Sequence, residues 1–427
     1  MSKKVEFTII AITGRMNAGK SSLFNLLSGQ KNFAIVDLRP GTTADTVATR
    51  MEIHDFGPVK LLDTAGIDEG SILGEKKRKK TYEAIEEADL TLIVVDLLKY
   101  GQKNDFFPER AVARRAKHYG KQALMVYNIF KAGGIKPADL AALEKSANQK
   151  LNLGLKSLCL QATDFREQKK LVDFIKLNFQ RKTADVNLLP LAYDRGYVLL
   201  NIPMDEETPS LRLLRPQDMA VERLLRQYLI PVLYRPDLKK ARAGEAAEKQ
   251  RFLGTIKLLQ ESKEGLKLVI TDSQAVDILD RWLPKDISLT TFSVMMTNYM
   301  SGGNLKLFSR GLGALAKLKN GDRIVIMESC NHDRKCDDIG TKQIPGLIRV
   351  KLGLELKIDF SFGRPLPDDL KKYKLIVHCG GCMIDRQKYQ RRIVKIKEAG
   401  VPITNYGLFL AWVHNHAAVA RVVKIFK

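Results

Sequence analysis

The first 180 residues alternate short apolar runs with amphipathic segments. Six runs have the length and composition of strands, at 5–13, 46–53, 59–63, 90–96, 122–128 and 155–162. Segments with helical periodicity, such as 21–29 and 80–88, lie between them. Strands that alternate with helices favour a mostly parallel sheet covered on both faces. We therefore predict an α/β domain over residues 1–180.

The pattern changes between residues 185 and 263. One strand-like run at 197–204 is followed by a helical pattern at 216–234 and by a long charged helix candidate at 238–263. One strand and two helices bury little apolar surface by themselves. We therefore expect a small α+β domain that serves as an interface.

Strand-like runs return from residue 264, at 266–271, 287–296, 322–329, 354–360, 373–378 and 401–406. Helical patterns again separate them, which predicts a second open, parallel α/β domain over residues 264–427. In such sheets, functional sites form beyond the carboxyl ends of the strands.

Composition narrows the class of protein. The chain has 427 residues, enough for two or three domains, and 45% of them are apolar. No apolar run approaches the roughly 18 residues of a membrane span, and the best one is interrupted by Asp96. The first residues carry no long apolar core of a signal peptide. We expect a cytoplasmic protein without membrane contact, whose five cysteines are thiols.

The chain is strongly basic, with a net charge of +23. The excess is spread over all three regions, so it favours anionic partners in general and identifies none. A basic run at 76–80 could dock an acidic partner or could be a solvated helix start.

Residues 14–21 read GRMNAGKS and fit the phosphate-binding loop G-x-x-x-x-G-K-[ST]. The loop follows a strand run and opens a helix, which is the context that the motif requires. Gly14 and Gly19 let backbone N–H groups wrap a phosphate, and the helix dipole adds to the attraction. Lys20 would reach the β- and γ-phosphates, and Ser21 would bind Mg²⁺.

Two further segments fit the same chemistry. Asp63 ends a strand in LLDTAG, where it could hold Mg²⁺ through water while the Gly66 backbone faces the γ-phosphate. Thr42 and Thr43 stand between the two motifs, where a switch threonine belongs. The candidate catalytic residues are Lys20, Thr43, Asp63 and Gly66. The candidate nucleotide-binding residues are Gly14, Asn17, Ala18, Gly19, Lys20, Ser21, Ser22, Thr42, Thr43, Asp63 and Asn128.

Together these motifs resemble the translation-factor-like GTPases, in particular the branch of Era and the tRNA-modifying GTPase MnmE. The resemblance implies GTP and Mg²⁺, and it makes Asn17 a candidate for binding K⁺, as in potassium-activated members. Ile67 follows DTAG where Ras-like enzymes carry a catalytic Gln. An apolar side chain cannot orient water, so K⁺, Asp68 or Glu69 would have to help.

The base-recognition motifs depart from that family. Asn128 is retained from N-K-x-D, but Ile129 replaces Lys, and Lys131 stands where Asp should accept from guanine. Lysine has no acceptor atom. The later S-A element reads Gln161-Ala162. The sequence therefore predicts weakened or lost guanine selectivity.

Cysteine and histidine gather in the last third of the chain. Cys330 and His332 follow one strand run, and His378, Cys379 and Cys382 follow another. Two glycines between Cys379 and Cys382 allow both sulfurs to face one point. Three thiolates suit an Fe–S cluster, and a zinc site with three Cys and one His is the alternative. Cys336 lies outside the pattern and is either a bystander or a competing ligand.

A GTPase domain, a short middle segment and C-x-H…H-C-x-x-C resemble the FeFe-hydrogenase maturation GTPases, the HydF family, over essentially the whole chain. Other segments agree, among them 202–217, 268–276 and 337–345. The resemblance implies a 4Fe–4S cluster on Cys330, Cys379 and Cys382 with an exchangeable fourth position. Candidates for that position or its surroundings are His332, His378 and Asp337. It also implies that the middle segment is a homodimerisation domain.

The same resemblance implies a function. Such a protein is a scaffold that accepts a di-iron subcluster from radical S-adenosylmethionine maturases and passes it to apo-FeFe-hydrogenase. The GTPase would gate partner binding or release. One rival is an Era-like GTPase acting on RNA or the ribosome; nucleic acid is disfavoured because no GXXG-bearing KH pattern appears. The other rival is a zinc-stabilised nucleotide hydrolase without a cluster.

Overall fold

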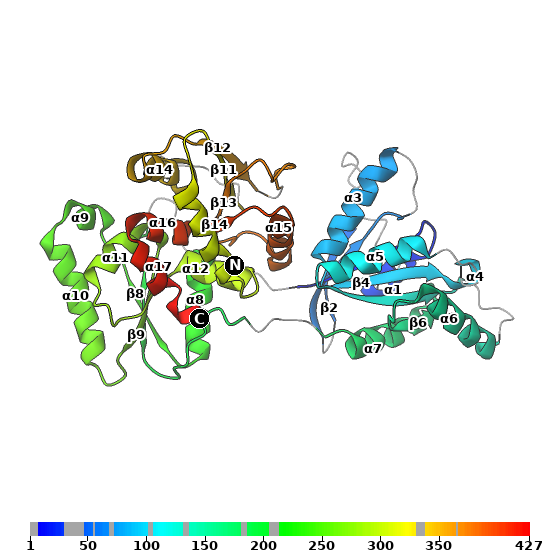
Figure 1. Ribbon diagram of the computed structural model, residues 1–427. Helices are drawn as coiled ribbons and strands as arrows, with labels where there is room; N and C mark the ends of the chain where they lie inside the picture. The colour runs from blue at the N-terminus through cyan, green and yellow to red at the C-terminus, as the bar shows by residue number, and fades with distance from the viewer. Residues whose placement is uncertain are drawn as a thin grey trace, which may run out of the picture. The chain divides into compact units, whose positions relative to one another are not determined.

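The structure is a computed structural model that describes residues 7–29, 47–53, 56–67, 72–100, 106–130, 136–180, 186–204, 213–329, 338–363 and 366–427. The chain divides into two compact units, Met1–Lys182 and Thr183–Lys427, which we call the N-terminal and C-terminal units (Figure 1). Within the ranges described, none of the helices is both long enough and apolar enough to cross a bilayer.

The N-terminal unit is built on a six-stranded sheet in the order β2-β3-β1-β4-β5-β6. Only the β2–β3 pair is antiparallel, and the other neighbours run parallel. The strands are β1 (Thr8–Gly14), β2 (Val47–Ile53), β3 (Gly57–Asp63), β4 (Leu90–Asp96), β5 (Gln122–Asn128) and β6 (Ser157–Leu160). The predicted parallel sheet is confirmed.

Helices cover both faces of this sheet because its central strands are apolar on both sides. In β4, Leu92 and Val94 pack with residues of α1 and α7, whereas Ile93 and Val95 pack with residues of α3, α5 and α6. The helices are α1 (Lys20–Ser28), α3 (Ile72–Glu87), α4 (Leu97–Tyr100), α5 (Phe107–His118), α6 (Pro137–Leu151) and α7 (Gln168–Asn178).

The C-terminal unit holds two four-stranded sheets, each with parallel neighbours throughout. The first has the order β10-β9-β7-β8 and the second β12-β11-β13-β14. The strands are β7 (Tyr197–Asn201), β8 (Ile230–Tyr234), β9 (Leu266–Thr271), β10 (Leu289–Thr291), β11 (Arg323–Glu328), β12 (Lys357–Phe362), β13 (Leu375–His378) and β14 (Ile403–Asn405). The first sheet thus draws β9 and β10 from beyond residue 263, where the sequence predicted a domain boundary.

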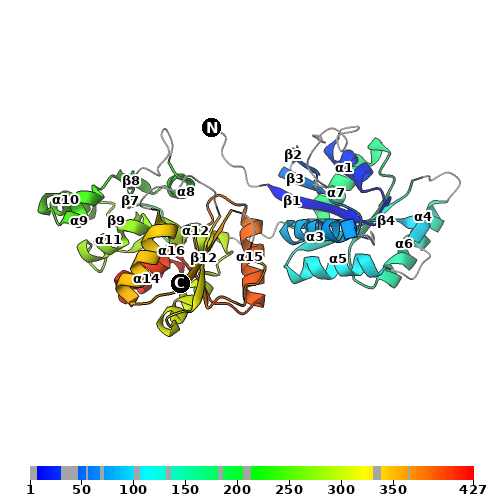
Figure 2. The same ribbon diagram turned by 90° about the horizontal axis from the view of Figure 1, so that it is seen from above.

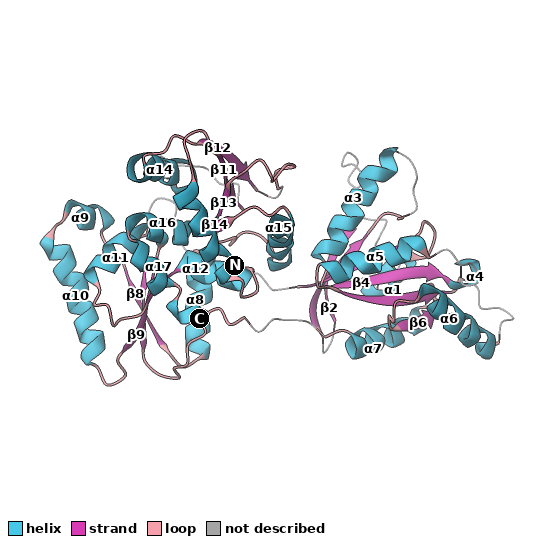
Figure 3. Ribbon diagram, viewed as in Figure 1, coloured by secondary structure: helices cyan, strands magenta, loops and turns pink. Residues whose placement is uncertain are grey.

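The two sheets share one connectivity. In each, the first strand has the second on one side and the third on the other, and the fourth forms the far edge. Helices follow the first, third and fourth strands of both sheets (Figure 3). In the first sheet they are α8 (Arg215–Arg226), α11 (Val276–Trp282) and α12 (Phe292–Met300), and in the second α14 (Ile344–Leu352), α15 (Arg386–Glu398) and α16 (Tyr406–His414). The first sheet also has α9 (Leu238–Ala243) and α10 (Ala246–Glu261) after its second strand, which have no counterpart among the described residues between β12 and β13. We call residues 197–300 the first repeat and 323–414 the second repeat.

The two repeats pack on each other reciprocally around one shared apolar core. Helix α13 (Leu305–Gly311), which follows the first repeat, packs on β14 of the second. Helix α17 (His416–Val422), which follows the second repeat, packs on β10 of the first. There the Thr290 hydroxyl donates to the Val422 carbonyl oxygen at 2.8 Å. Figure 2 shows the unit from a second direction.

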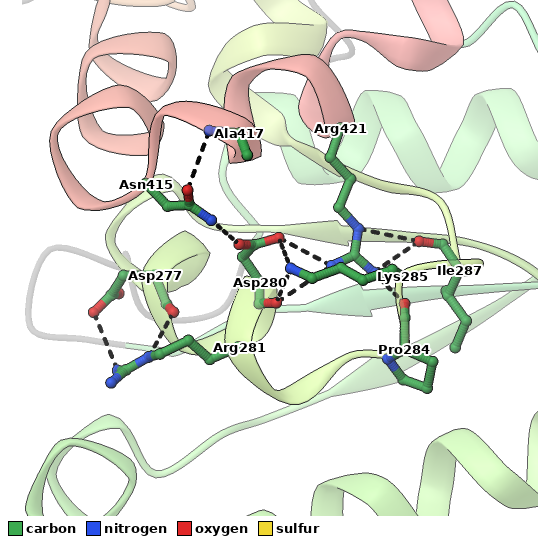
Figure 4. Close-up of polar contacts among 9 residues, drawn as sticks. All are labelled: Asp277, Asp280, Arg281, Pro284, Lys285, Ile287, Asn415, Ala417 and Arg421. Atoms are coloured by element: carbon green, nitrogen blue, oxygen red, sulfur yellow. Dashed lines mark hydrogen bonds and ion pairs between the residues drawn. The ribbon is translucent and has the colours of Figure 1, made fainter.

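A buried carboxylate fixes the end of α17 to α11 (Figure 4). Asp280 accepts from Arg421 at 3.0 Å, from Lys285 at 2.9 Å and from Asn415 at 2.8 Å. Burial alone would raise the pKa of Asp280, but these hydrogen bonds outweigh it and hold the pKa below its usual value. The carboxylate therefore stays ionised and links the first repeat to the helix that follows the second repeat.

The helical pattern predicted over 216–234 is wrong at its end. Helix α8 stops at Arg226, and Tyr228 adopts a left-handed φ of 59°. Residues 230–234 then form the edge strand β8. Pro231 is accommodated because an edge strand can leave one N–H position unused. The turn at Tyr228 contains no glycine or proline that would mark it in the sequence. The helical periodicity therefore extended the predicted helix into the strand.

Two other predicted elements are divided in the structure. The long helix expected at 238–263 is α9 (Leu238–Ala243) and α10 (Ala246–Glu261), separated at Gly244, whose φ is 79°. The strand expected at 287–296 is β10, followed at once by α12. The Thr291 hydroxyl accepts from the Val294 N–H and caps that helix at 3.1 Å.

Candidate functional site

The phosphate loop lies between β1 and α1, as the motif predicted. Asn17 and Gly19 both have left-handed backbones, with φ of 60° and 99°. A methyl group on Gly19 would overlap the Asn128 side-chain amide, so the close approach also requires glycine. The Lys20 ammonium donates to the Arg15 carbonyl oxygen at 2.8 Å, which folds its side chain back over the loop. The loop is thus shaped to wrap an anion.

Two buried side chains hold this loop in place. The Arg15 guanidinium donates to both carboxylate oxygens of Glu109 on α5, at 2.8 and 3.2 Å. The Asn128 amide donates to the Ala18 carbonyl oxygen at 3.1 Å and accepts from the Ala162 N–H at 3.0 Å. Asn128 therefore joins the phosphate loop to the loop after β6. Sequence reasoning missed the Arg15–Glu109 pair, because no local pattern links residues so far apart.

The predicted magnesium residues also lie together. The Ser21 hydroxyl donates to Asp63 at 3.0 Å. Burial raises the pKa of Asp63, although hydrogen bonding from Ser21 and the charge of Lys20 oppose the rise. The other carboxylate oxygen of Asp63, Oδ1, is buried and has no hydrogen-bond partner among the described residues. A buried, unpartnered carboxylate oxygen beside a hydroxyl fits a hard cation such as Mg²⁺.

The segment around Gly66 is tied to the strand that carries the phosphate loop. The Thr64 N–H donates to the Ile12 carbonyl oxygen at 3.2 Å, and the Ile67 N–H donates to that of Gly14 at 3.3 Å. The Ile67 side chain is buried in the apolar core with Ile93 of β4. A side chain buried among apolar residues offers no polar atom that could orient water. The remaining candidates, Thr42, Thr43, Asp68, Glu69 and Lys131, lie outside the described residues.

A cavity of about 700 Å³ opens beside the phosphate loop. It is lined by Ser22 and Asn25 of α1 and by residues 161–166. Gln161 and Ala162, which stand in place of the S-A element, therefore line this cavity. Asn128 contacts the phosphate loop beside it.

The second candidate site is the turn after β13 that carries Cys379 and Cys382. The Cys379 N–H donates to the Met327 carbonyl oxygen at 2.9 Å, and the Ser329 N–H donates to the Cys379 sulfur at 3.2 Å. Both cysteines are partly exposed. Gly381 has a φ of 72°, and a methyl group there would overlap the Tyr389 ring. The glycine is thus required by the turn and by its packing.

His378 lies beside this turn but is fully buried. Its Nδ1 lies 2.7 Å from the Cys379 carbonyl oxygen, and its Nε2 lies 3.2 Å from Arg392. Burial and the Arg392 charge lower the pKa of His378 to about 3. The neutral ring therefore donates through Nδ1 and accepts through Nε2. Both ring nitrogens are engaged within the protein, which differs from the ligand position that the sequence allowed.

The other half of the Cys/His pattern, with Cys330, His332, Cys336 and Asp337, lies outside the described residues. Its flanks are placed, however. Strand β11 is paired with β13, Met327 is in register with His378, and Ser329 touches the Cys379 sulfur. In the described ranges, no group of three or more His, Cys, Asp or Glu side chains is arranged to hold a metal ion. The topology nevertheless places Ser329, the last described residue before that segment, at the cysteine turn.

Three family profiles match successive parts of the chain. Residues 9–129 match a GTPase family described as 50S ribosome-binding GTPase. Residues 190–301 match the hydrogen maturase F dimerization domain, and residues 306–425 match the hydrogen maturase F tetramerization domain. The last two matches correspond to the first and the second repeat.

Several single relatives are GTPases. GTPase Der of Rhodopseudomonas palustris (strain TIE-1) is 31% identical over 285 residues, 66% of this chain and 51% of Der. The tRNA modification GTPase MnmE of Nitrosomonas europaea is 46% identical over 88 residues, 20% of this chain and 19% of MnmE. A crystal structure of Aquifex aeolicus Era is 19% identical with a TM-score of 0.34, covering 54% of this chain and 93% of Era. The chain spans about half the length of this Der protein and a smaller share of MnmE.

Proposed function

The chain belongs to the hydrogen maturase F family, and on this premise we propose that it is a GTP-binding scaffold for the maturation of FeFe-hydrogenase. In this role it holds a 4Fe–4S cluster, accepts a di-iron subcluster precursor and transfers it to the apo-hydrogenase. The observation that carries the proposal is the contact between the Ser329 N–H and the Cys379 sulfur. That contact supports a single site formed by Cys330 and the cysteine turn.

The proposed cluster ligands are Cys330, Cys379 and Cys382. Three thiolates leave one position of a 4Fe–4S cluster exchangeable, which suits a scaffold that must accept and release cargo. His332 and Asp337 remain candidates for the fourth position. We assign His378 to the surroundings of the site, because both of its ring nitrogens are engaged by Cys379 and Arg392. The buried Arg392 guanidinium offers positive charge near an anionic cluster.

An activation assay tests the scaffold role. The chain would be loaded anaerobically with the radical S-adenosylmethionine maturases and then mixed with apo-FeFe-hydrogenase. We expect hydrogen evolution that depends on this chain. Hydrogen evolution at the same rate without the chain would contradict the proposal.

For the GTPase domain we propose that Lys20 binds the β- and γ-phosphates. Ser21, Thr43 and Asp63 would hold Mg²⁺, directly or through water, and the Gly66 backbone would face the γ-phosphate. When bound, Mg²⁺ neutralises the charge that develops on the phosphates. The unpartnered Asp63 Oδ1 and its neighbour Ser21 support this assignment.

Guanine selectivity is proposed to be weak. Asn128 keeps its link to the phosphate loop, but Lys131 has no atom that could accept from guanine N1 and N2. We expect ATP and GTP to displace a fluorescent GTP analogue at similar concentrations. A strong preference for GTP in that competition would contradict the prediction.

A monovalent cation is proposed to take part in hydrolysis. Ile67 is buried and cannot orient water, and Asn17 stands in the phosphate loop with a left-handed backbone. We expect GTP hydrolysis to run faster in K⁺ than in Na⁺ at equal ionic strength. Equal rates in the two salts would exclude this role for Asn17.

A further inference from the structure

The cysteine turn of the second repeat is supported by the first repeat. Gly380 lies against α12, because a Cβ atom built on it would come within 3.4 Å of the Met296 side chain and 3.6 Å of the Ser293 backbone. Arg215, the first residue of α8, donates through Nη1 to the Cys382 carbonyl oxygen at 2.6 Å. A longer contact of 3.4 Å reaches the Ile384 carbonyl oxygen. The turn therefore rests on two helices from the other repeat.

The start of α8 is held firmly enough to aim Arg215. The Gln217 side chain accepts from the Leu214 N–H at 2.9 Å, and Pro216 fixes the backbone of the first helical turn. Side chains of a helix lean toward its N-terminus, so Arg215 extends beyond the helix end. Within the part of the chain that the structure describes, its recorded hydrogen bonds are those to Cys382 and Ile384.

We propose that Arg215 is a positioning residue of the cysteine site, contributed by the first repeat. Its charge-assisted hydrogen bond fixes the carbonyl of Cys382 and with it the direction of the Cys382 side chain. It also brings a positive charge to the backbone of the turn. The effect of Arg215 on a bound cluster rests on the proposed function. Its effect on the position of the Cys382 thiol holds without any metal. It also implies that the dimerization domain is part of the cluster site.

The test compares Arg215→Gln, Arg215→Lys and the control Arg226→Gln in the full-length chain. Arg226 lies on the same helix but is exposed and paired with Glu222. In the reconstituted protein we expect the Gln variant to release iron to a chelator about tenfold faster than the parent. Its cluster should also have a lower reduction potential and a changed electron paramagnetic resonance signal. The Lys variant keeps the positive charge, so its iron release and reduction potential should lie between those of the parent and the Gln variant. The Arg226→Gln control should match the parent in both.

The same variants are compared without metal, by mass-spectrometric mapping of the alkylation of Cys379 and Cys382. We expect the Gln variant to change the alkylation rate of Cys382, whereas the control does not. An unchanged alkylation rate, together with parental iron release and potential, would overturn the proposal. A parent chain that binds no Fe–S cluster would overturn the proposed function only, since the alkylation result would still decide the role of Arg215.

Discussion

Replacing Lys20 by alanine is expected to lower nucleotide hydrolysis by about a hundredfold or more, while the cysteine site keeps its full iron content. Lys20 is the side chain that the phosphate loop places for the β- and γ-phosphates, and its ammonium donates a hydrogen bond to the Arg15 carbonyl oxygen of the same loop. The measurement is steady-state GTP hydrolysis together with iron and sulfide analysis of the same preparation.

Lys145→Ala is the matched control for that experiment. Lys145 is an exposed lysine on α6 of the same unit, far in sequence from the phosphate loop. It should leave both hydrolysis and iron content unchanged. If Lys20→Ala instead hydrolysed GTP at the parental rate, the assignment of residues 14–21 as the phosphate site would be wrong.

The second large effect is expected from the cysteine turn. Cys379→Ala and Cys382→Ala should each reduce bound iron from about four per chain to a minor fraction and abolish activation of the hydrogenase. GTP hydrolysis should stay at the parental rate, because the phosphate loop belongs to the other unit. The measurements are metal analysis, the visible absorption of the cluster and hydrolysis, made on one preparation of each variant.

Cys159→Ala provides the control within the same chain. Cys159 is a partly buried thiol on β6, and burial together with the charge of Glu144 raises its pKa to about 11. It should therefore remain a neutral thiol, and its loss should spare the cluster. A cysteine-turn variant that lost GTP hydrolysis and kept its iron would reverse the division of roles between the two units.

The elements that the sequence predicted well are those with strong local signals. The strand runs of the N-terminal unit appear as β1 to β6, and the central strands β1, β4 and β5 are buried on both faces. The phosphate loop needed only Gly14, Gly19 and Lys20 at their fixed spacing, and Asp63 lies beside Ser21 as that spacing implied. Sequence motifs were sufficient to predict a site whose residues directly follow the ends of strands.

The features that the sequence did not predict depend on contacts between distant residues. The reciprocal packing of the two repeats is invisible along the chain, because their sequences share no repeated pattern that we detected. The link from Arg215 to Cys382 joins two such repeats. His378 illustrates the same limit at a single residue. Its place in the pattern allowed either the open ligand position or the surroundings of the site, and only the structure shows that it is buried against Arg392 and Tyr389.

Similarly, local polarity alone could not divide the region 216–234. The helical spacing of apolar residues continues through the segment, whereas in the structure the helix ends before Tyr228 and β8 then pairs with β7. Residues 230–234 are therefore a strand through their pairing with β7, a contact with a distant segment that local sequence patterns do not reveal.

The central claim is that the cysteine site holds a 4Fe–4S cluster beside a GTPase domain. The most direct measurement is iron, acid-labile sulfide and zinc analysis of the full-length chain purified without oxygen. We predict a brown protein with about four irons and four sulfides per chain. One zinc per chain without sulfide would contradict it and would favour a structural zinc site of three cysteines and a histidine.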